Sequence, residues 1–343
     1  MNENNAKIKV FGVGGAGCNS VGRMVAEGVE NVEFYVVNTD APILDNSICE
    51  NKIYLGTLGA GGNPEVGRKA AMDHESDLRE ALKDAEMVFI TAGLGGGTGT
   101  GAAPVVARLA KEQGSLTVAV VTKPFPFEGR KRMMQALNGL DDLKQFVDSL
   151  IVISNAQVLE TIGSIPMGDA FKEADNILRQ AVQTVTDLIT QPLLINLDFA
   201  DIKSVMENQG SALIGIGMAQ GENKAREAAT KAIQSPLLEA QITGAKNAIV
   251  NVTGGPGVTL QDASIAANTI TAAAGNDVNI IWGALINEKL GDYIIVTVIA
   301  TGFEMAEENK VVSGVKEPVT TGRTEDKPKN DGNRPVSFAF RDL

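Results

Sequence analysis

The stretch that decides the fold of this 343-residue chain lies at residues 95–101 and reads Gly95-Gly96-Gly97-Thr98-Gly99-Thr100-Gly101. It follows a predicted strand, Met87–Ala92, and a predicted helix opens at Ala102. Such a loop can hold phosphate groups on its many backbone N–H donors, and the threonine hydroxyls can supplement them. No lysine follows the glycines, so the loop is not of the Walker type. The alternative is a flexible turn without a ligand, which the cost of glycine in backbone entropy disfavours.

A second glycine-rich loop lies near the start of the chain and reads Gly12-Val13-Gly14-Gly15-Ala16-Gly17. It satisfies the dinucleotide fingerprint G-x-G-x-x-G, whose glycines let backbone N–H groups approach an anion at a helix N-terminus. Asp40, which closes the second predicted strand, imitates the ribose-binding acid of that fingerprint. This loop alone is compatible with a nicotinamide-dependent dehydrogenase, or with a tight turn that binds nothing. A dehydrogenase, however, does not need the loop at residues 95–101.

Short apolar runs alternate with helical patterns through the first half of the chain. The predicted strands are Ile8–Val13, Val32–Val37, Met87–Ala92, Leu116–Val121 and Leu150–Ile153. The predicted helices are Asn19–Gly28, Glu75–Asp84, Ala102–Gln113 and Gly129–Val147. This alternation predicts an α/β fold with a doubly wound, largely parallel sheet. Ligands of such sheets bind beyond the carboxyl ends of the strands, where both glycine loops belong.

A long helix is predicted next, at about Gly168–Thr190, because apolar residues recur there at three- and four-residue spacing; Pro192 ends it. A second block then predicts a smaller α+β domain, with strands Ala212–Ala219, Ala248–Val252, Asn279–Ala284 and Tyr293–Ile299 and helices Lys224–Ile233 and Gln261–Ala273. Residues 304–333 are polar and free of aromatics, which is typical of a disordered linker. The last ten residues contain Phe338 and Phe340 and are either a docking tail or an unselected end.

The composition limits the function. A formal net charge of −12 argues against a nucleic-acid binder, since nothing offsets phosphate repulsion. Cys18 and Cys49 are the only cysteines and have no metal spacing, as fits a reducing cytoplasm. His74 is the only histidine, and its acidic neighbours predict a solvated helix start, so a histidine triad or metal site is not expected. No apolar run reaches the roughly 18 residues of a membrane span.

The loop Gly95–Gly101 resembles the signature loop of the tubulin/FtsZ family, and the similarity runs from about Lys7 to Phe303. Further stretches that match the family, in the right order, are Asn63-Pro64-Glu65-Val66-Gly67, Thr122-Lys123-Pro124-Phe125, Phe127-Glu128-Gly129-Arg130-Lys131-Arg132 and Asn196-Leu197-Asp198-Phe199-Ala200-Asp201. The resemblance implies a GTPase that polymerises head to tail in the bacterial division ring, with GTP or GDP and Mg²⁺ as ligands. It also implies a cytoplasmic protein that acts at the division site.

With this resemblance the chain is expected to divide into five parts. These are a GTP-binding domain (1–167), a central connecting helix (168–190), a C-terminal α+β domain carrying the catalytic loop (191–303), a disordered linker (304–333) and a C-terminal peptide (334–343).

The resemblance also assigns binding roles to individual residues. The phosphates are expected on Gly14, Gly15, Ala16, Gly17, Cys18 and Asn19, and on Gly95, Gly96, Gly97, Thr98, Gly99, Thr100 and Gly101. Cys18 is interpreted as a small filler beside the nucleotide and not as a nucleophile. Glu128 would accept from the ribose and Arg132 would add positive charge. The alternative for both is a charged, solvated helix start.

The base is expected on Asn155, Phe171 and Asp175. Phe171 and Asp175 lie four residues apart, hence on one helix face, so that Phe171 could stack on guanine while the carboxylate accepts from its N1–H and N2–H₂ groups. For Asn155 the alternative is a helix N-cap, and for Phe171 it is ordinary core.

The catalytic residues implied are Asn196, Asp198 and Asp201. From spacing alone, Asp198 would be the N-cap of a helix starting near Phe199, with Asp201 in its first turn. In the family this loop enters the nucleotide site of the next subunit and positions the attacking water. The two interpretations are compatible.

The end of the chain departs from the family. Many members end in a D-I-P-x-F-L peptide, whereas residues 334–343 read RPVSFAFRDL. The expected partners are further copies of the chain and division proteins that bind the tail; no nucleic acid is expected, and the membrane is reached only through a tether protein. Two alternatives remain at this point: a nicotinamide-dependent dehydrogenase, and a filament protein that binds GTP without hydrolysing it.

Overall fold

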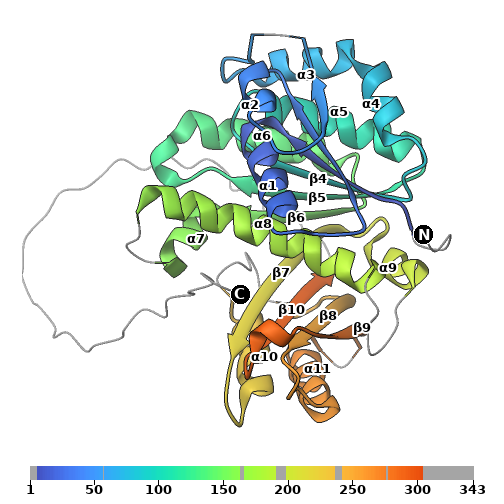
Figure 1. Ribbon diagram of the computed structural model, residues 1–343, viewed down its shortest axis with the longest axis vertical. Coiled ribbons are helices and arrows are strands. Elements are labelled where there is room, and N and C mark those ends of the chain that lie inside the picture. Colours follow the sequence, from blue (N-terminus) through green and yellow to red (C-terminus); the bar gives the residue numbers. More distant parts are fainter. Residues whose placement is uncertain are drawn as a thin grey trace, which may run out of the picture.

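The computed structural model describes residues 6–56, 58–162, 166–190, 198–235, 242–275 and 277–303. In this part of the chain ten strands form one sheet in the order β3-β2-β1-β4-β5-β6-β7-β10-β8-β9 (Figure 1). Its first six strands are all parallel and are β1 (Ile8–Val13), β2 (Glu33–Asn38), β3 (Asn51–Tyr54), β4 (Met87–Gly93), β5 (Leu116–Lys123) and β6 (Ser149–Ser154).

The register of the parallel strands places their carboxyl ends at one edge of the sheet, since Val13 of β1 pairs with Val37 of β2 and with Ala92 of β4. The central strands are buried on both faces, as β-branched runs predict. One face packs against α1 (Gly14–Ala26), α2 (Ala41–Asp45), α7 (Asn155–Ile162) and α8 (Met167–Thr190). The other packs against α3 (Pro64–Asp73), α4 (Glu75–Leu82), α5 (Thr98–Glu112) and α6 (Arg130–Lys144).

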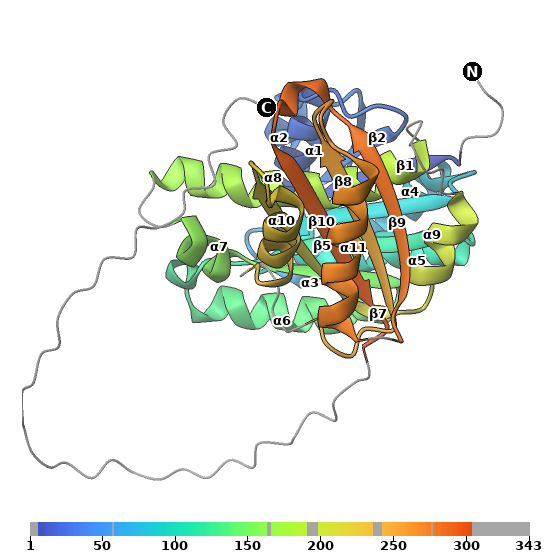
Figure 2. The ribbon, with the colours of Figure 1, turned by 90° about the horizontal axis from the view of Figure 1, so that it is seen from below.

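The second half of the chain forms the other end of the sheet from β7 (Gly210–Ala219), β8 (Asn247–Gly254), β9 (Asn279–Ile286) and β10 (Ile294–Thr301). β10 is antiparallel to both β7 and β8, and β8 is parallel to β9. One face carries α10 (Lys224–Ile233) and α11 (Leu260–Ala274), which lie side by side over the strands in Figure 2. The opposite face shares a core with α8 and with α9 (Phe199–Met206).

Helix α8 joins the two halves. Its buried side chains, among them Leu178, Val182 and Val185, belong to one core cluster with residues of β1 and β5 on one side and of β7, β8 and β10 on the other. A second link comes from three residue pairs between β6 and β7, starting at Ser149 with Gly210. The halves are therefore held together by packing and by backbone hydrogen bonds.

The predicted fold class is confirmed, with differences at the helix starts. Helix α1 begins at Gly14 and not at Asn19, and α5 begins at Thr98 and not at Ala102. The last residues of both glycine loops are thus first turns of helices. The sequence analysis missed β3, α2, α3 and α7. Strand β3 is short and largely exposed at the sheet edge, so apolar periodicity could not reveal it.

His74 was expected at a solvated helix start, and this was only partly right. It joins α3 to α4, but its side chain is half-buried, and its Nδ1 atom lies 2.9 Å from the Ala70 carbonyl oxygen. The expected linker and C-terminal peptide lie outside the described residues. In the described part of the chain, no helix is both long and apolar enough to cross a membrane.

Helices α3 and α5 approach so closely that glycine is needed between them. A Cβ atom on Gly101 would clash with the Pro64 carbonyl oxygen and lie 2.6 Å from the Arg68 nitrogen. We therefore expect Gly101→Ala to lower the free energy of unfolding by about 1–3 kcal/mol, the usual cost of overpacking. Urea unfolding followed by circular dichroism measures it.

The matched control is Gly168→Ala in α8, where an added Cβ has open space. It should leave stability unchanged or slightly higher, because alanine favours helix over glycine. If Gly101→Ala proves as stable as the unmodified chain, the close approach of α3 and α5 is wrong.

Candidate functional site

Two helix N-termini meet at the carboxyl edge of the parallel strands. Helix α1 follows β1 directly, and α5 follows the loop after the neighbouring strand β4. Neither helix has a side-chain cap or an acidic residue in its first turn, so its first N–H groups and the positive end of its dipole stay available. The two loops touch, because a Cβ on Gly14 would lie 2.6 Å from the Gly99 nitrogen. This arrangement suits an anion with several charges, such as a polyphosphate.

The threonines of the loop at residues 95–101 stabilise that loop from within. Thr100 Oγ1 accepts a hydrogen bond of 2.8 Å from the Gly95 N–H, so that donor is already used. Gly95 instead supplies a backbone with φ of +97°, the left-handed region that favours glycine. The hydroxyl of Thr98 lies 2.7 Å from that of Thr39, which directly follows β2. The sequence analysis missed Thr39; a polar residue after a buried strand, at the ligand edge of the sheet, was the available signal.

Cys18 lies on the inner side of α1 and not in the phosphate cradle. Its Sγ atom is 3.6 Å from the Gly12 carbonyl oxygen and 3.8 Å from the Asn38 amide nitrogen. Burial raises the pKa of this thiol to about 12, so it stays protonated and unreactive at neutral pH. Only its backbone is left to contact a phosphate. Asn19, the next residue, is exposed.

Glu128 and Arg132 form an ion pair beside the loop at residues 95–101. Glu128 Oε2 lies 3.0 Å from Arg132 Nη1, and Glu128 Oε1 accepts from the Phe125 N–H at 2.8 Å. A Cβ on Gly95 would lie 2.7 Å from the Arg132 carbonyl oxygen, which places α6 against the loop. Gly96 is closest to the guanidinium itself, because its Cβ would lie 3.7 Å from Arg132 Nη2. The cradle of N–H groups is thus flanked by one positive side chain.

The three residues expected to contact the base come from α7 and α8 at the same edge. Phe171 is 41% exposed and packs edge-on against Phe125, with ring centroids 5.0 Å apart; it is therefore not ordinary core. Asn155 opens α7 directly after β6. Its Oδ1 atom is buried and has no hydrogen-bond partner among the described residues, so it can accept from a bound ligand.

The side chain of Asp175, in α8, contacts helix α1. One of its oxygens accepts from Ser20 Oγ and the other from Arg23 Nε, each at 3.1 Å. Burial raises the pKa of this carboxyl, while Arg23 and Ser20 oppose the rise. Each oxygen retains a second lone pair that could take a donor from guanine.

Asp198 and Asp201 lie far from these residues. They form a capping box at the start of α9, as their spacing predicts: Asp198 Oδ1 accepts from the Asp201 N–H at 2.9 Å, and Asp201 Oδ2 accepts from the Asp198 N–H at 3.1 Å. Both side chains are exposed. Asn196, the third residue of this set, lies outside the described residues.

Helix α9 lies at the amino edge of the parallel strands. Its C-terminal end is hydrogen-bonded to Ser149, the first residue of β6, whereas Asn155, which is expected to contact the base, follows the carboxyl end of the same strand. Helix α8 runs between the two edges, and Figure 1 shows α7 and α9 near its opposite ends. Its 24 residues span about 36 Å. The carboxylates of α9 therefore cannot reach the phosphate loops of their own chain.

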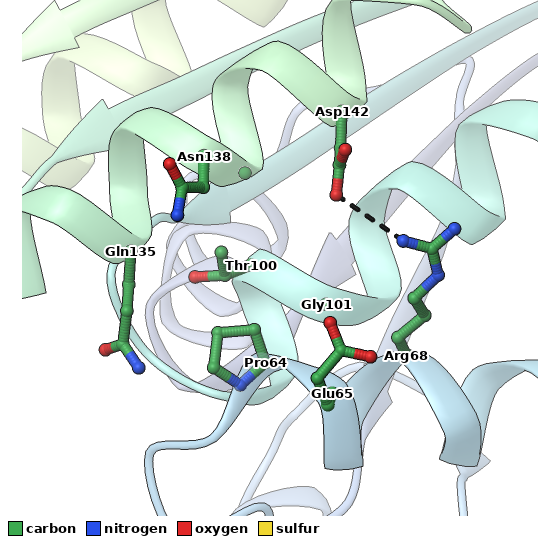
Figure 3. A pocket seen from close by; sticks show the side chains of 9 residues that line it. Pro64, Glu65, Arg68, Thr100, Gly101, Gln135, Asn138 and Asp142 are labelled. Atoms are coloured by element: carbon green, nitrogen blue, oxygen red, sulfur yellow. Dashed lines mark ion pairs between the residues drawn. The ribbon is translucent and has the colours of Figure 1, made fainter.

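A separate cleft of about 230 Å³ lies on the side of α5, the helix that follows the glycine loop at residues 95–101. Figure 3 shows side chains of α6 facing those of α3 across it, with Arg68 and Asp142 paired at 3.5 Å. Its lining residues are Pro64, Glu65, Arg68, Thr100, Gly101, Gln135, Asn138, Gly139 and Asp142. Thr100 is shared with the phosphate loop, but its hydroxyl is engaged by Gly95. The cleft is thus separate from the N–H groups that are expected to bind phosphate.

Comparison with known proteins agrees with this geometry. A profile of the Tubulin/FtsZ family, GTPase domain, matches residues 7–163, and one of the FtsZ family, C-terminal domain, matches residues 210–304. The empty FtsZ dimer of M. jannaschii has 45% identity and a TM-score of 0.85, over 88% of this chain and 89% of that chain.

More distant structures share the fold. The CetZ2 protofilament from Haloferax volcanii with bound GTPγS has 20% identity and a TM-score of 0.72, over 88% of this chain and 94% of that one. The GDP-bound CetZ1 monomer from the same organism has 18% identity and a TM-score of 0.75, over 88% and 96%.

None of these findings supports the dehydrogenase alternative. The chain matches two family profiles in the right order and a homologue at 45% identity over most of both chains. The two uncapped helix N-termini at the ligand edge are consistent with a nucleotide-binding member of this family. The chain therefore belongs to the tubulin/FtsZ family, binds guanine nucleotide and hydrolyses GTP.

Proposed function

We propose that this chain polymerises head to tail and hydrolyses GTP at each junction between subunits, as the filament-forming GTPase of the bacterial division ring. The observation that carries this proposal is the placement of the phosphate loops and of Asp198 and Asp201 at opposite edges of one subunit. Stacking two copies head to tail brings one edge against the other. Two structural neighbours, the FtsZ dimer and the CetZ2 protofilament, are consistent with such stacking.

The nucleotide would lie along the carboxyl edge. Its phosphates would bind to residues 14–19 and 95–101, where Gly95 would contribute its turn and not its N–H group. Arg132 would add positive charge and Glu128 would accept from the ribose. Asn155, Phe171 and Asp175 would hold the guanine. The free Oδ1 of Asn155 supports this role, because a guanine N–H group would satisfy a buried acceptor that the described residues leave unpaired.

The water that attacks the γ-phosphate needs a group to orient it. The two phosphate loops offer glycines, threonines, Asn19 and a thiol whose pKa is raised. None of these can orient the attacking water as a carboxylate can. Asp198 and Asp201 of the next subunit, with Asn196, would supply that function. Hydrolysis would then depend on assembly.

Mg²⁺ would accompany the triphosphate, since no Walker lysine offsets the phosphate charge. Among the described residues no group of three or more His, Cys, Asp or Glu side chains gathers, so the ion would take most of its ligands from phosphates and water. When bound, it would neutralise negative charge on the phosphates of GTP. Excess EDTA should abolish hydrolysis, and undiminished hydrolysis would contradict this role.

The cellular part of the proposal rests on the family. The chain would act in the cytoplasm at the division site, and residues 334–343 would bind division proteins, one of which tethers the filament to the membrane.

A change of charge at Gly96 tests the phosphate site. A Cβ at this position makes only an ordinary contact, so a side chain fits without strain. Gly96→Asp would place a carboxylate among the phosphates, and repulsion of about 1–4 kcal/mol should weaken GTP binding at least about fivefold. Gly96→Asn is the isosteric neutral control and should bind within about threefold of the unmodified chain. Equal affinities of the two variants, measured by calorimetry, would rule out phosphates beside Gly96.

The shared site is tested with Asp201→Asn, which can still accept from the Asp198 N–H and keep the helix cap. We expect it to bind GTP and assemble but to hydrolyse at least about 10²-fold more slowly. Mixing it with Gly96→Asp, which has an intact catalytic loop, should partly restore activity at interfaces that combine the good pocket with the good loop.

Pelleting must first show that the two variants co-assemble. Full activity of Asp201→Asn alone would reduce Asp201 to a helix cap. Co-assembly without any recovered activity would contradict a site built from two subunits.

A further inference from the structure

The C-terminal end of α9 is capped by side chains from both halves of the chain. The last carbonyl groups of a helix have no partner within it. Here Ser149 Oγ of β6 donates to the Met206 carbonyl at 2.6 Å, and Thr301 Oγ1 of β10 donates to the Val205 carbonyl at 2.7 Å. Both hydroxyls are buried. Two strands that are distant in sequence therefore fix the same turn of α9.

Asp148, the residue before Ser149, fixes the turn that leads from α9 to β7. Its Oδ1 atom accepts from the Asn208 N–H at 3.1 Å, and its carbonyl oxygen accepts from the N–H groups of Gln209 and Gly210 at 2.8 and 2.9 Å. Asn208 at this turn has a left-handed φ of +55°, a conformation that asparagine adopts more readily than most residues. The side chain of Asp148 is only 4% exposed.

The charge of Asp148 is balanced by Lys111, whose Nζ atom lies 2.5 Å from Oδ1 and also donates to Asn208 Oδ1 at 3.0 Å. Oδ2 accepts from the Thr117 N–H at 2.9 Å. A buried carboxylate persists only with such partners. Lys111 lies in the last turn of α5, the helix whose first turn belongs to the phosphate loop. One helix thus connects the phosphate loop to the anchor of α9.

The anchored end of α9 sets the position of its exposed end. Ile202, Val205 and Met206 are fully buried, whereas Asp198 and Asp201 project from the first turn. The capping box at that turn is local and gives it no fixed place relative to the rest of the chain. The position of the two carboxylates therefore depends on the packing of the buried face of α9 and on what holds its C-terminal turn.

We propose that Asp148, Ser149 and Thr301, with Lys111, are positioning residues for the reaction in the neighbouring subunit. They hold α9 so that Asp198 and Asp201 enter the next pocket in a reactive pose. This inference rests on the proposed function, because it requires α9 to act across a junction. Misplacement of a reacting group by about 1 Å can cost about 10²-fold in rate, so small shifts of this anchor matter.

The test uses Thr301→Val, which keeps the shape but removes the hydroxyl, and Thr301→Ser, which keeps the hydroxyl. Thr301→Val should lower the hydrolysis rate per assembled subunit at least about tenfold, and Thr301→Ser should restore most of it. GTP affinity of the unassembled protein should not change, since the pocket lies at the other edge. Ser149→Ala and Lys111→Met should act in the same direction. Because Lys111→Met leaves the buried Asp148 without its counter-charge, urea unfolding and GTP affinity must show that each variant is folded before its rate is compared.

Mixed filaments separate positioning from general damage. Thr301→Val mixed with Gly96→Asp should regain activity, because the second variant supplies an intact α9. Thr301→Val mixed with Asp201→Asn should not regain activity, because both carry a defective α9.

Wild-type rates for Thr301→Val and Lys111→Met would overturn the inference. The same recovery of activity in both mixtures, or a loss of GTP affinity in Thr301→Val, would overturn it too. If Asp201→Asn itself is fully active, the proposed function fails; if it is inactive and Thr301→Val is active, only this inference fails.

Discussion

The rest of the structure depends on one constraint, the parallel alignment of β1 with β2 and β4. That alignment gathers the carboxyl ends of the strands at a single edge, and both glycine loops follow strands that end there. Helix α8 then carries the chain back to the opposite edge before α9 begins. A pocket and a pair of exposed carboxylates consequently face in opposite directions, which is the geometry that a head-to-tail polymer can use.

The proposed phosphate site relies mainly on backbone N–H groups, with Arg132 as the charged side chain beside it. The first turns of α1 and α5 are uncapped, and glycines at positions 14 and 99 let the two turns touch. The threonines shape the loop from inside, through Thr100 to Gly95 and through Thr98 to Thr39. Because these contacts lie within the protein, the loop needs little reordering to bind a ligand, and this limits the conformational entropy lost on binding.

The sequence was most informative where a residue type has a local physical meaning. The glycine loops, the alternating strands and helices, the long amphipathic α8 and the cap at Asp198 could all be predicted, because glycine, apolar periodicity and N-cap residues act over a few positions. The pairing of Asp175 with Arg23, the role of Thr100 inside its loop and the hub at Asp148 could not. These contacts join segments far apart in the chain, and no local pattern encodes them. The family resemblance supplied the expected base-contacting and catalytic residues, which spacing alone would have assigned to caps and core.

The central claim is that one subunit carries half of each active site, and the dependence of hydrolysis on protein concentration tests it most directly. Phosphate release from GTP, measured over a concentration series with light scattering recorded alongside, should be nearly absent at low concentration. Specific activity should then rise sharply at the concentration where scattering first reports assembly. A specific activity that stays constant across the series, including where no assembly is detected, would show that a single subunit holds a complete site and would contradict the account.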